Sequence, residues 1–293
     1  MIWFVFASLS AIFSAAAAVT QKKILFRVTA LEFSFLVSLC ILALSSFIPF
    51  IVDVASVSQS MLFIILGKSL LAGTAFLFVM MSLEHNQISD ALPLLGLTPA
   101  VTAIAALLLI GESLRGWEWV GLGLMITGTY ILERRPSAGI FEPWREVFLK
   151  KSHFYIFAAL VLFAVSSVAD KLLLSGYRID PLSLLFCQHV VYAAMFGFLL
   201  LIRSSPFSEV ALKGKQQLPY ILAVAVLTIA YRFAQFEATK EAPVALVLAV
   251  KRTSILYASF LGGKMFSDER LGLKLLGGAM IVVAGFIILR NVS

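Results

Sequence analysis

The chain has 293 residues, of which 61% are hydrophobic and only 13% are charged, whereas about 25% of the residues in an ordinary soluble domain are charged. This composition excludes a soluble enzyme or soluble binding protein and indicates a polytopic membrane protein. The net charge of +7 would suggest nucleic acid in a soluble protein, but here the cations lie in short loops beside apolar segments, where anionic lipid attracts them. We therefore expect membrane lipid, and no nucleic acid, as a partner.

Ten apolar segments have the length of a membrane-spanning helix. They lie at residues 2–20, 31–51, 61–83, 89–111, 117–133, 153–175, 181–202, 218–238, 242–262 and 271–290. The first of them is apolar like a signal peptide, but no basic residues precede it and it has a counterpart after residue 153, so we expect a span. The connections are too short for a soluble domain. The fold class that we predict is an all-α integral membrane protein with ten transmembrane helices.

An internal repeat of about 155 residues divides the chain. The alignment sets Glu112 against Glu269 and one pair of glycines against another, all at a shift of 157. We expect a first five-span repeat at 1–133, a linker at 134–152 and a second five-span repeat at 153–293. Because five is odd, the second copy enters the membrane from the opposite side. The repeats are thus predicted to be inverted, an arrangement that places a substrate site near the midplane.

Glycines in the fifth and tenth spans suggest how the two copies meet. Gly121 and Gly128 lie two turns apart on one helical face, and Gly278 and Gly285 repeat that spacing. Glycine lets helix backbones approach closely in lipid, so we expect a tight packing contact between these spans; a generic glycine-rich span is the alternative.

The cations of the connecting loops lie mostly on the side of the membrane opposite the termini, which favours both termini outside the cytoplasm.

The ninth span carries two adjacent cations, Lys251 and Arg252, at its centre. At about 1.5 Å per residue they lie roughly 14 Å from the start of the span, near the middle of a hydrocarbon core about 30 Å thick. The apolar runs on either side are too short to span alone, so we expect one helix through both cations. Such a charge costs about 2.5 to 3.5 kcal/mol on insertion scales and usually marks a pathway.

The second copy has cations where the first copy is apolar. Arg232 aligns with Leu77, and the Lys251–Arg252 pair aligns with Leu94 and Leu95. Arginine suits carboxylate or phosphate bidentately, and lysine adds a point charge. The predicted substrate-binding residues are Lys251, Arg252, Arg232, Tyr231, Gln235, Gln188 and His189.

An alternative is that these cations pair internally with an acid near the end of a neighbouring span. The acids in question are Asp170, Glu237 and Glu241. Further groups have structural interpretations: Lys68 is expected to extend to the membrane interface, His189 to be a hydrogen-bonded structural residue rather than a proton carrier, and Glu112 and Glu269 to cap helix ends rather than to gate.

Catalytic motifs are absent from the sequence. It contains no HExxH, no GxSxG and no glycine-rich phosphate loop, so we expect no enzyme. Cys40 and Cys187 fall in apolar segments of different halves, which indicates free thiols. We expect no metal site and no cofactor.

Two stretches carry a resemblance to a known family. They are LLLIGESLRGWEWVGLGLMITGTYIL at 107–132 and LGGKMFSDERLGLKLLGGAMIVVAGFIIL at 261–289, each with a helix end, a glutamate and a glycine-bearing span. They resemble the drug/metabolite transporter superfamily, in particular the EamA-like proteins with two five-span copies. The Lys251–Arg252 pair followed by Ser254 is similar to the pair that is implicated in holding phosphate in span nine of triose-phosphate translocators. Small multidrug exporters of the superfamily need an acid in span one, which 2–20 lacks.

The resemblance and the buried cations together lead to one functional hypothesis. We expect a multi-pass secondary transporter of a bacterial cytoplasmic (inner) membrane that moves a small anionic metabolite, phosphorylated or carboxylated, by alternating access. One alternative is an exporter of amino acids or neutral metabolites whose cations are paired internally. Another is a membrane protein that binds lipid without transport. The sequence specifies no coupling ion, direction of transport or oligomeric state. Members of the family commonly have both termini in the cytoplasm, whereas the distribution of loop cations in this chain favours termini on the opposite side.

Overall fold

Helices account for the regular structure in this computed structural model, which describes residues 2–54, 57–85, 95–133, 151–203, 206–254, 257, 276–277, 279–280, 283–284 and 287. Within these ranges there is no strand, so the all-α prediction is confirmed for them. The elements, in chain order, are α1 (Ile2–Leu25), α2 (Ala30–Leu44), the 3-10 turn η1 (Ile48–Phe50), α3 (Gln59–His85), α5 (Thr98–Ile110), α6 (Gly116–Glu133), α8 (Lys151–Lys171), the π turn η3 (Leu172–Gly176), α9 (Pro181–Ile202), α10 (Phe207–Glu241) and α11 (Val244–Arg252).

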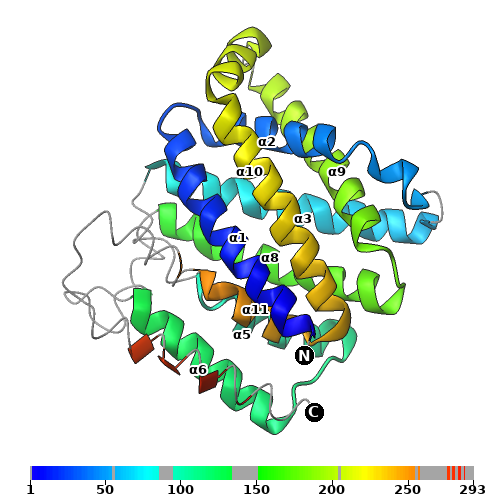
Figure 1. The fold of residues 1–293 in the computed structure, drawn as a ribbon, viewed down its shortest axis with the longest axis vertical. Helices are drawn as coiled ribbons and strands as arrows, with labels where there is room; N and C mark the ends of the chain where they lie inside the picture. Colours follow the sequence, from blue (N-terminus) through cyan, green and yellow to red (C-terminus); the bar gives the residue numbers. More distant parts are fainter. Residues whose placement is uncertain are drawn as a thin grey trace.

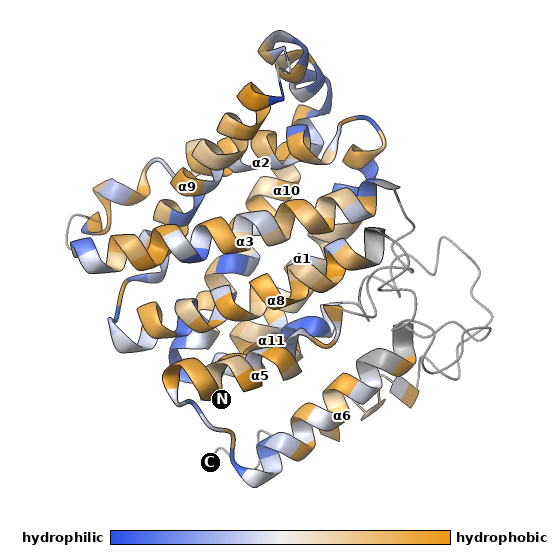
Figure 2. Cartoon of the chain, turned by 180° about the vertical axis from the view of Figure 1, so that it is seen from behind, coloured by the Kyte–Doolittle hydropathy of each residue, from blue (hydrophilic) through white to orange (hydrophobic). Residues whose placement is uncertain are grey.

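Six of the described helical segments are long and apolar enough to cross a membrane. They are Ile2–Leu25, Ala30–Phe50, Gln59–Glu84, Phe154–Gly176, Pro181–Ile202 and Phe207–Glu241, and α5 is a shorter apolar helix. The helices are hydrophobic along most of their lengths, with polar residues gathered towards their ends (Figure 2). The chain is therefore a multi-pass membrane protein, as predicted. The count of ten spans stays a prediction, because several predicted spans extend beyond the described residues.

Helix α10 differs from the prediction at its beginning. The apolar pattern predicted a span from residue 218, but the helix starts at Phe207 and includes 35 residues. That length corresponds to about 52 Å, well beyond a hydrocarbon core of about 30 Å. The first turns therefore extend past the other helices (Figure 1), where Lys213 Nζ donates to Glu32 Oε1 of α2 at 2.7 Å.

The two halves of the chain interleave. Helix α1 packs along α10, α3 along α8, α2 along α9, and α5 against both α8 and α11. Each of these pairs joins a helix before residue 134 to one after residue 150. The largest apolar core cluster combines side chains of both halves, among them Phe33, Ala75, Ile156 and Val224. A cavity between the halves is consequently enclosed by helices from both.

Helix α11 ends at the predicted pair of cations. The Thr253 N–H donates to the Val250 carbonyl at 3.0 Å, which tightens the last turn, and the Tyr257 N–H donates to the Thr253 carbonyl at 3.3 Å. The expected continuous helix over 242–262 is thus interrupted after Arg252 in the part that the structure describes. Lys251 and Arg252 occupy the last turn of α11, where the helix dipole favours positive charge.

The glycine contact between spans five and ten stays a prediction. Gly121 and Gly128 are buried on α6, whereas Gly278 and Gly285 lie outside the described residues. Close by, Ala284 shares an apolar cluster with Leu122 and Met125 of α6.

Candidate functional site

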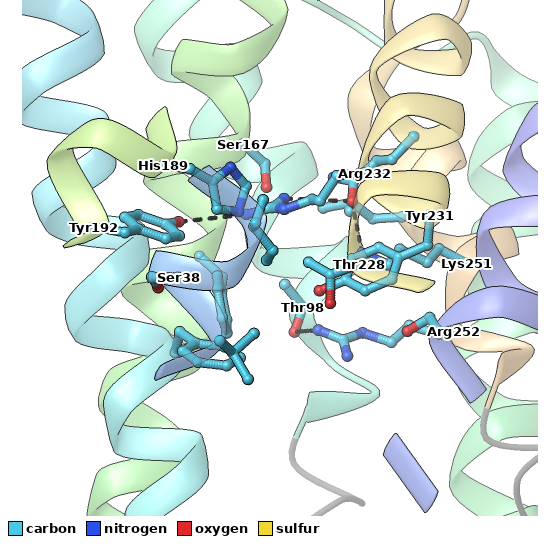
Figure 3. A pocket seen from close by; sticks show the side chains of 17 residues that line it. Ser38, Thr98, Ser167, His189, Tyr192, Thr228, Tyr231, Arg232, Lys251 and Arg252 are labelled. Atoms are coloured by element: carbon cyan, nitrogen blue, oxygen red, sulfur yellow. Dashed lines mark hydrogen bonds between the residues drawn. The ribbon is translucent and has the colours of Figure 1, made fainter. Parts of the chain in front are cut away.

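A cavity of about 130 Å³ lies between the two halves of the chain. Helices α1, α2, α3 and α5 of the first half and α8, α9, α10 and α11 of the second half all contribute to its wall (Figure 3). The lining residues are Ser14, Val37, Ser38, Ile41, Phe76, Thr98, Phe163, Ser167, His189, Tyr192, Thr228, Tyr231, Arg232, Gln235, Leu248, Lys251 and Arg252. Six of the seven predicted substrate-binding residues are among them, and Gln188 is not.

Arg232 and Lys251 share one neutral acceptor. Lys251 Nζ donates to Gln235 Oε1 at 2.6 Å, and Arg232 Nη1 reaches the same oxygen at 3.5 Å. The Lys251 ammonium also lies over the Tyr231 ring, 4.5 Å from its centroid, at a distance suited to a cation–π contact. An amide oxygen and an aromatic face lower the cost of burying these charges, but neither carries a negative charge.

The two arginines have further neutral partners. Arg252 Nη2 donates to the Thr98 hydroxyl of α5 at 2.8 Å, and Arg232 Nη2 reaches the Tyr192 hydroxyl of α9 at 3.5 Å. In Figure 3, Lys251 and Arg252 lie across the cavity from Tyr192 and Ser38. Arg232 extends from α10 to Tyr192, so cations and hydroxyl groups alternate around the cavity.

The acids predicted as internal partners are occupied elsewhere or do not pair. Asp170 accepts from Lys68 at 2.6 Å, and Glu237 from the exposed Lys240 at 3.3 Å. Within the described ranges, neither Arg232 nor Lys251 forms an ion pair with a carboxylate, and the cavity lining contains no acid. Their direct partners among the described residues are dipoles and aromatic rings.

The expectation that Lys68 extends to the interface is wrong. Its side chain is 1% exposed and its ammonium contacts Asp170, whose side chain is 3% exposed. Gln188 Oε1 also accepts from Lys68 Nζ, so this predicted substrate residue belongs to the buried ion pair instead of the cavity wall. The misplacement has a simple cause: Gln188 and His189 are adjacent on α9 and point in different directions around the helix.

His189 has the structural contact that was predicted for it. Its Nδ1 is 2.8 Å from the Leu185 carbonyl, one turn earlier in α9, and its ring packs edge-on against Tyr192 at 5.4 Å. The side chain nevertheless lines the cavity. It can shape the wall without carrying charge.

Several hydroxyl-bearing residues of the wall were not predicted. Tyr192 follows His189 by three residues and shares its helix face, so helical spacing could have found it. Thr98, Ser38 and Ser167 carry no charge and fall in ordinary apolar segments, which gives no sequence signal. The Thr228 hydroxyl is buried in the wall without a hydrogen-bond partner among the described residues, so it is available to a bound solute.

Glu112 caps a helix, although not its own. Its carboxylate accepts from the Val244 N–H at 3.2 and 3.4 Å, and so caps α11, whose N-cap residue Pro243 offers no side-chain bond. Gly111, with φ +67°, turns the chain to bring Glu112 there. Burial raises the pKa of Glu112 above its usual range, and the nearby Lys171 charge opposes that rise. Glu269, its partner in the repeat, lies outside the described residues.

Comparisons with known proteins identify the family. The profile of the EamA-like transporter family matches residues 1–134 and 150–291, which is nearly the whole chain in two parts. No curated protein matches the chain. A solved structure titled "Crystal structure of protein" is similar over 98% of this chain and 94% of its own, with a TM-score of 0.70 and 18% identity. At that identity the likeness shows the fold alone.

Proposed function

This chain belongs to the EamA-like transporter family, and we propose that it is a secondary transporter of a small anionic solute, phosphorylated or carboxylated. The observation that carries the proposal is the shared acceptor of Arg232 and Lys251. Two half-buried cations converge on one neutral oxygen beside a cavity, and no carboxylate among the described residues pairs with either. A bound anion would supply the missing charge, and arginine and lysine are the usual ligands of such groups.

The cavity supports a small solute. A volume of about 130 Å³ lies below the 300–1,000 Å³ of pockets for drug-sized ligands. The lining combines three cations with hydroxyls and with apolar side chains such as Phe76 and Phe163. A solute with one anionic group and a short body matches this distribution.

We infer further that the protein works as two inverted repeats with alternating access in a bacterial inner membrane. The packing supports the repeat. If spans one to five correspond to spans six to ten, the pair α1 with α10 exchanges with the pair α8 with α3, and the pairs α2 with α9 and α5 with α11 map onto themselves. A site on such a pseudo-symmetry axis is open to each side in turn when the halves rock.

Ligand-dependent stability and flux test the proposal. The purified protein is heated with phosphorylated metabolites, nucleotide sugars, carboxylates, neutral amino acids or organic cations, because a ligand that binds the native state raises its apparent stability. We expect one anion class to stabilise it and to be transported into proteoliposomes. Both effects should be lost in Lys251→Gln/Arg252→Gln.

A matched control removes the same number of positive charges at positions outside the cavity. Arg203→Gln/Lys215→Gln removes two exposed cations, and we expect it to retain both effects. Stabilisation by neutral amino acids that persists in Lys251→Gln/Arg252→Gln would overturn the anion proposal and favour a neutral-metabolite exporter. Binding without flux would favour a membrane protein that does not transport.

A further inference from the structure

Lys251 is the lysine of a cationic cluster. Its Nζ shares Gln235 Oε1 with Arg232 Nη1, and Arg252 follows it directly in the chain. Its other close neighbour is the face of Tyr231. The ammonium therefore lies between two guanidinium-bearing residues, with a neutral amide as its hydrogen-bond acceptor.

Among the residues that the structure describes, the cavity wall holds no carboxylate beside Lys251 and Arg232. Its titratable groups from α9 are His189 and Tyr192, and those from α10 are Tyr231 and Arg232. The parts of α1, α2, α3, α5 and α8 in the wall are serine, threonine or apolar residues. The Asp170 carboxylate of α8 attracts both Lys251 and Arg232 over a longer distance, but its direct partner is Lys68 at 2.6 Å.

Like charges in a low-dielectric wall destabilise one another's charged forms. A guanidinium keeps its proton in proteins, whereas a buried ammonium can lose one. In the absence of a bound anion, the repulsion within the cluster therefore favours loss of a proton to water from Lys251 Nζ over loss from either guanidinium. An anion that enters the cavity has the opposite effect, because it stabilises the charged form of every basic side chain that it contacts.

We propose that Lys251 binds one proton together with each anion, so that the protein carries anion and proton in the same direction. The inference rests on the proposed function and adds the coupling ion to it. The step is balanced: the Lys251 amine gains a proton from the solution that supplies the anion, no covalent bond to the solute forms, and both dissociate on the other side. A monovalent anion then crosses without net charge.

Proton uptake per bound anion tests this inference. Malonate and methyl phosphate are titrated into purified protein in weak buffer at pH about 8.5, where carboxylates and phosphate monoesters are fully ionised. A pH indicator counts protons while calorimetry counts bound anions. We expect about one proton per anion in the wild type.

Lys251→Arg separates proton binding from charge, because arginine keeps a cation at this position and does not release its proton. We expect the ratio of protons to bound anions to fall close to zero in this variant, whatever its affinity, and to stay near one in Lys215→Arg, which changes an exposed lysine. A ratio that stays near one in Lys251→Arg would overturn the assignment to Lys251.

A second measurement needs no variant. Wild-type proteoliposomes that contain a pH-sensitive dye are given an inward malonate or methyl phosphate gradient, and we expect the interior to acidify as the anion enters. Anion binding and uptake without proton movement would overturn the coupling and leave the proposed function intact. If neither anion binds or enters while a neutral solute does, the proposed function fails, and the inference fails with it.

Discussion

Two lysines of this protein, the buried Lys68 and the half-buried Lys251, have opposite electrostatic surroundings. Lys68 of α3 is 1% exposed and is held by the Asp170 carboxylate at 2.6 Å, with Gln188 as a second acceptor. Lys251 of α11 is held by the amide oxygen of Gln235, which Arg232 also contacts. The first cation is neutralised inside the protein, and the second adds to a positive cluster beside a cavity.

The difference distinguishes a structural charge from one that is available to a ligand. Lys68 connects α3 to α8 and α9, and Ser166 of α8 also donates to its backbone carbonyl at 3.0 Å. Its ammonium already has a carboxylate and an amide oxygen as acceptors, and Lys68 does not line the cavity. Under the proposed function, the sign of the neighbouring charges is what separates Lys251 from Lys68 as a candidate ligand for an anion.

The largest effect on stability is expected when the compensated pair is broken. Asp170→Asn leaves the Lys68 ammonium buried without its counter-charge, which typically costs about 3 to 5 kcal/mol. We expect a large fall in the unfolding temperature of the purified protein. Lys68→Met/Asp170→Leu removes both charges and should recover most of the loss; a single variant as stable as the wild type would show that the pair is not a structural element.

The cationic cluster should behave in the opposite way. Arg232→Gln removes one of the mutually repelling charges, so we expect the unfolding temperature to stay the same or rise. Loss of charge-assisted hydrogen bonds worth about 1.5 to 3 kcal/mol should weaken anion binding roughly 10- to 100-fold. Isothermal titration with malonate or methyl phosphate measures the affinity. Unchanged affinity would remove Arg232 from the site, and Arg203→Gln serves as the exposed control.

A smaller effect is expected at Thr98. Its hydroxyl accepts from Arg252 Nη2 at 2.8 Å and donates to the Leu95 carbonyl at 2.6 Å. Thr98→Val keeps the shape and removes both bonds, so we expect anion affinity to fall about twofold to tenfold. Thr127→Val, which changes a threonine on the exposed face of α6, should leave affinity unchanged. Equal losses in both variants would indicate a general effect on folding.

The smallest effect concerns pH and Glu112. Burial raises the pKa of this carboxyl, so the folded protein binds its proton more tightly than the unfolded chain does. The stability that protonated Glu112 contributes is fully present below the unfolded pKa of about 4, and it is lost as the pH rises through the higher pKa of the folded protein. We expect the unfolding temperature to fall between these two pKa values and to fall less steeply in Glu112→Gln. Parallel curves for the two proteins would contradict this interpretation.

The sequence predicted the helical class, the membrane environment and the charged part of the cavity wall, because apolar length and charge inside an apolar segment are properties of single segments. Arg232, Gln235, Lys251 and Arg252 were found in this way. It did not predict the interruption of α11 after Arg252, which depends on the local turn at Thr253. The helical start of α10 at Phe207 was missed because that part of the helix is polar and extends beyond the apolar layer.

Partners across the bundle were harder to predict than the residues themselves. Lys68 and Asp170 are 102 positions apart in the chain, and no local pattern joins them. The same holds for Thr98 and Arg252, which come from different halves. Gln188 was assigned to the wrong site for this reason: its neighbours on other helices, and not its place beside His189, decide which charge it contacts.

A matched pair of lysine variants tests the central comparison most directly. The unfolding temperatures of Lys68→Met and Lys251→Met are measured with and without malonate or methyl phosphate. We predict that Lys68→Met lowers the temperature, since Asp170 loses its partner, and still responds to the anion, whereas Lys251→Met keeps or raises the temperature and no longer responds. Equal destabilisation by the two changes, with anion stabilisation retained in Lys251→Met, would contradict a charge cluster that is completed by a bound anion.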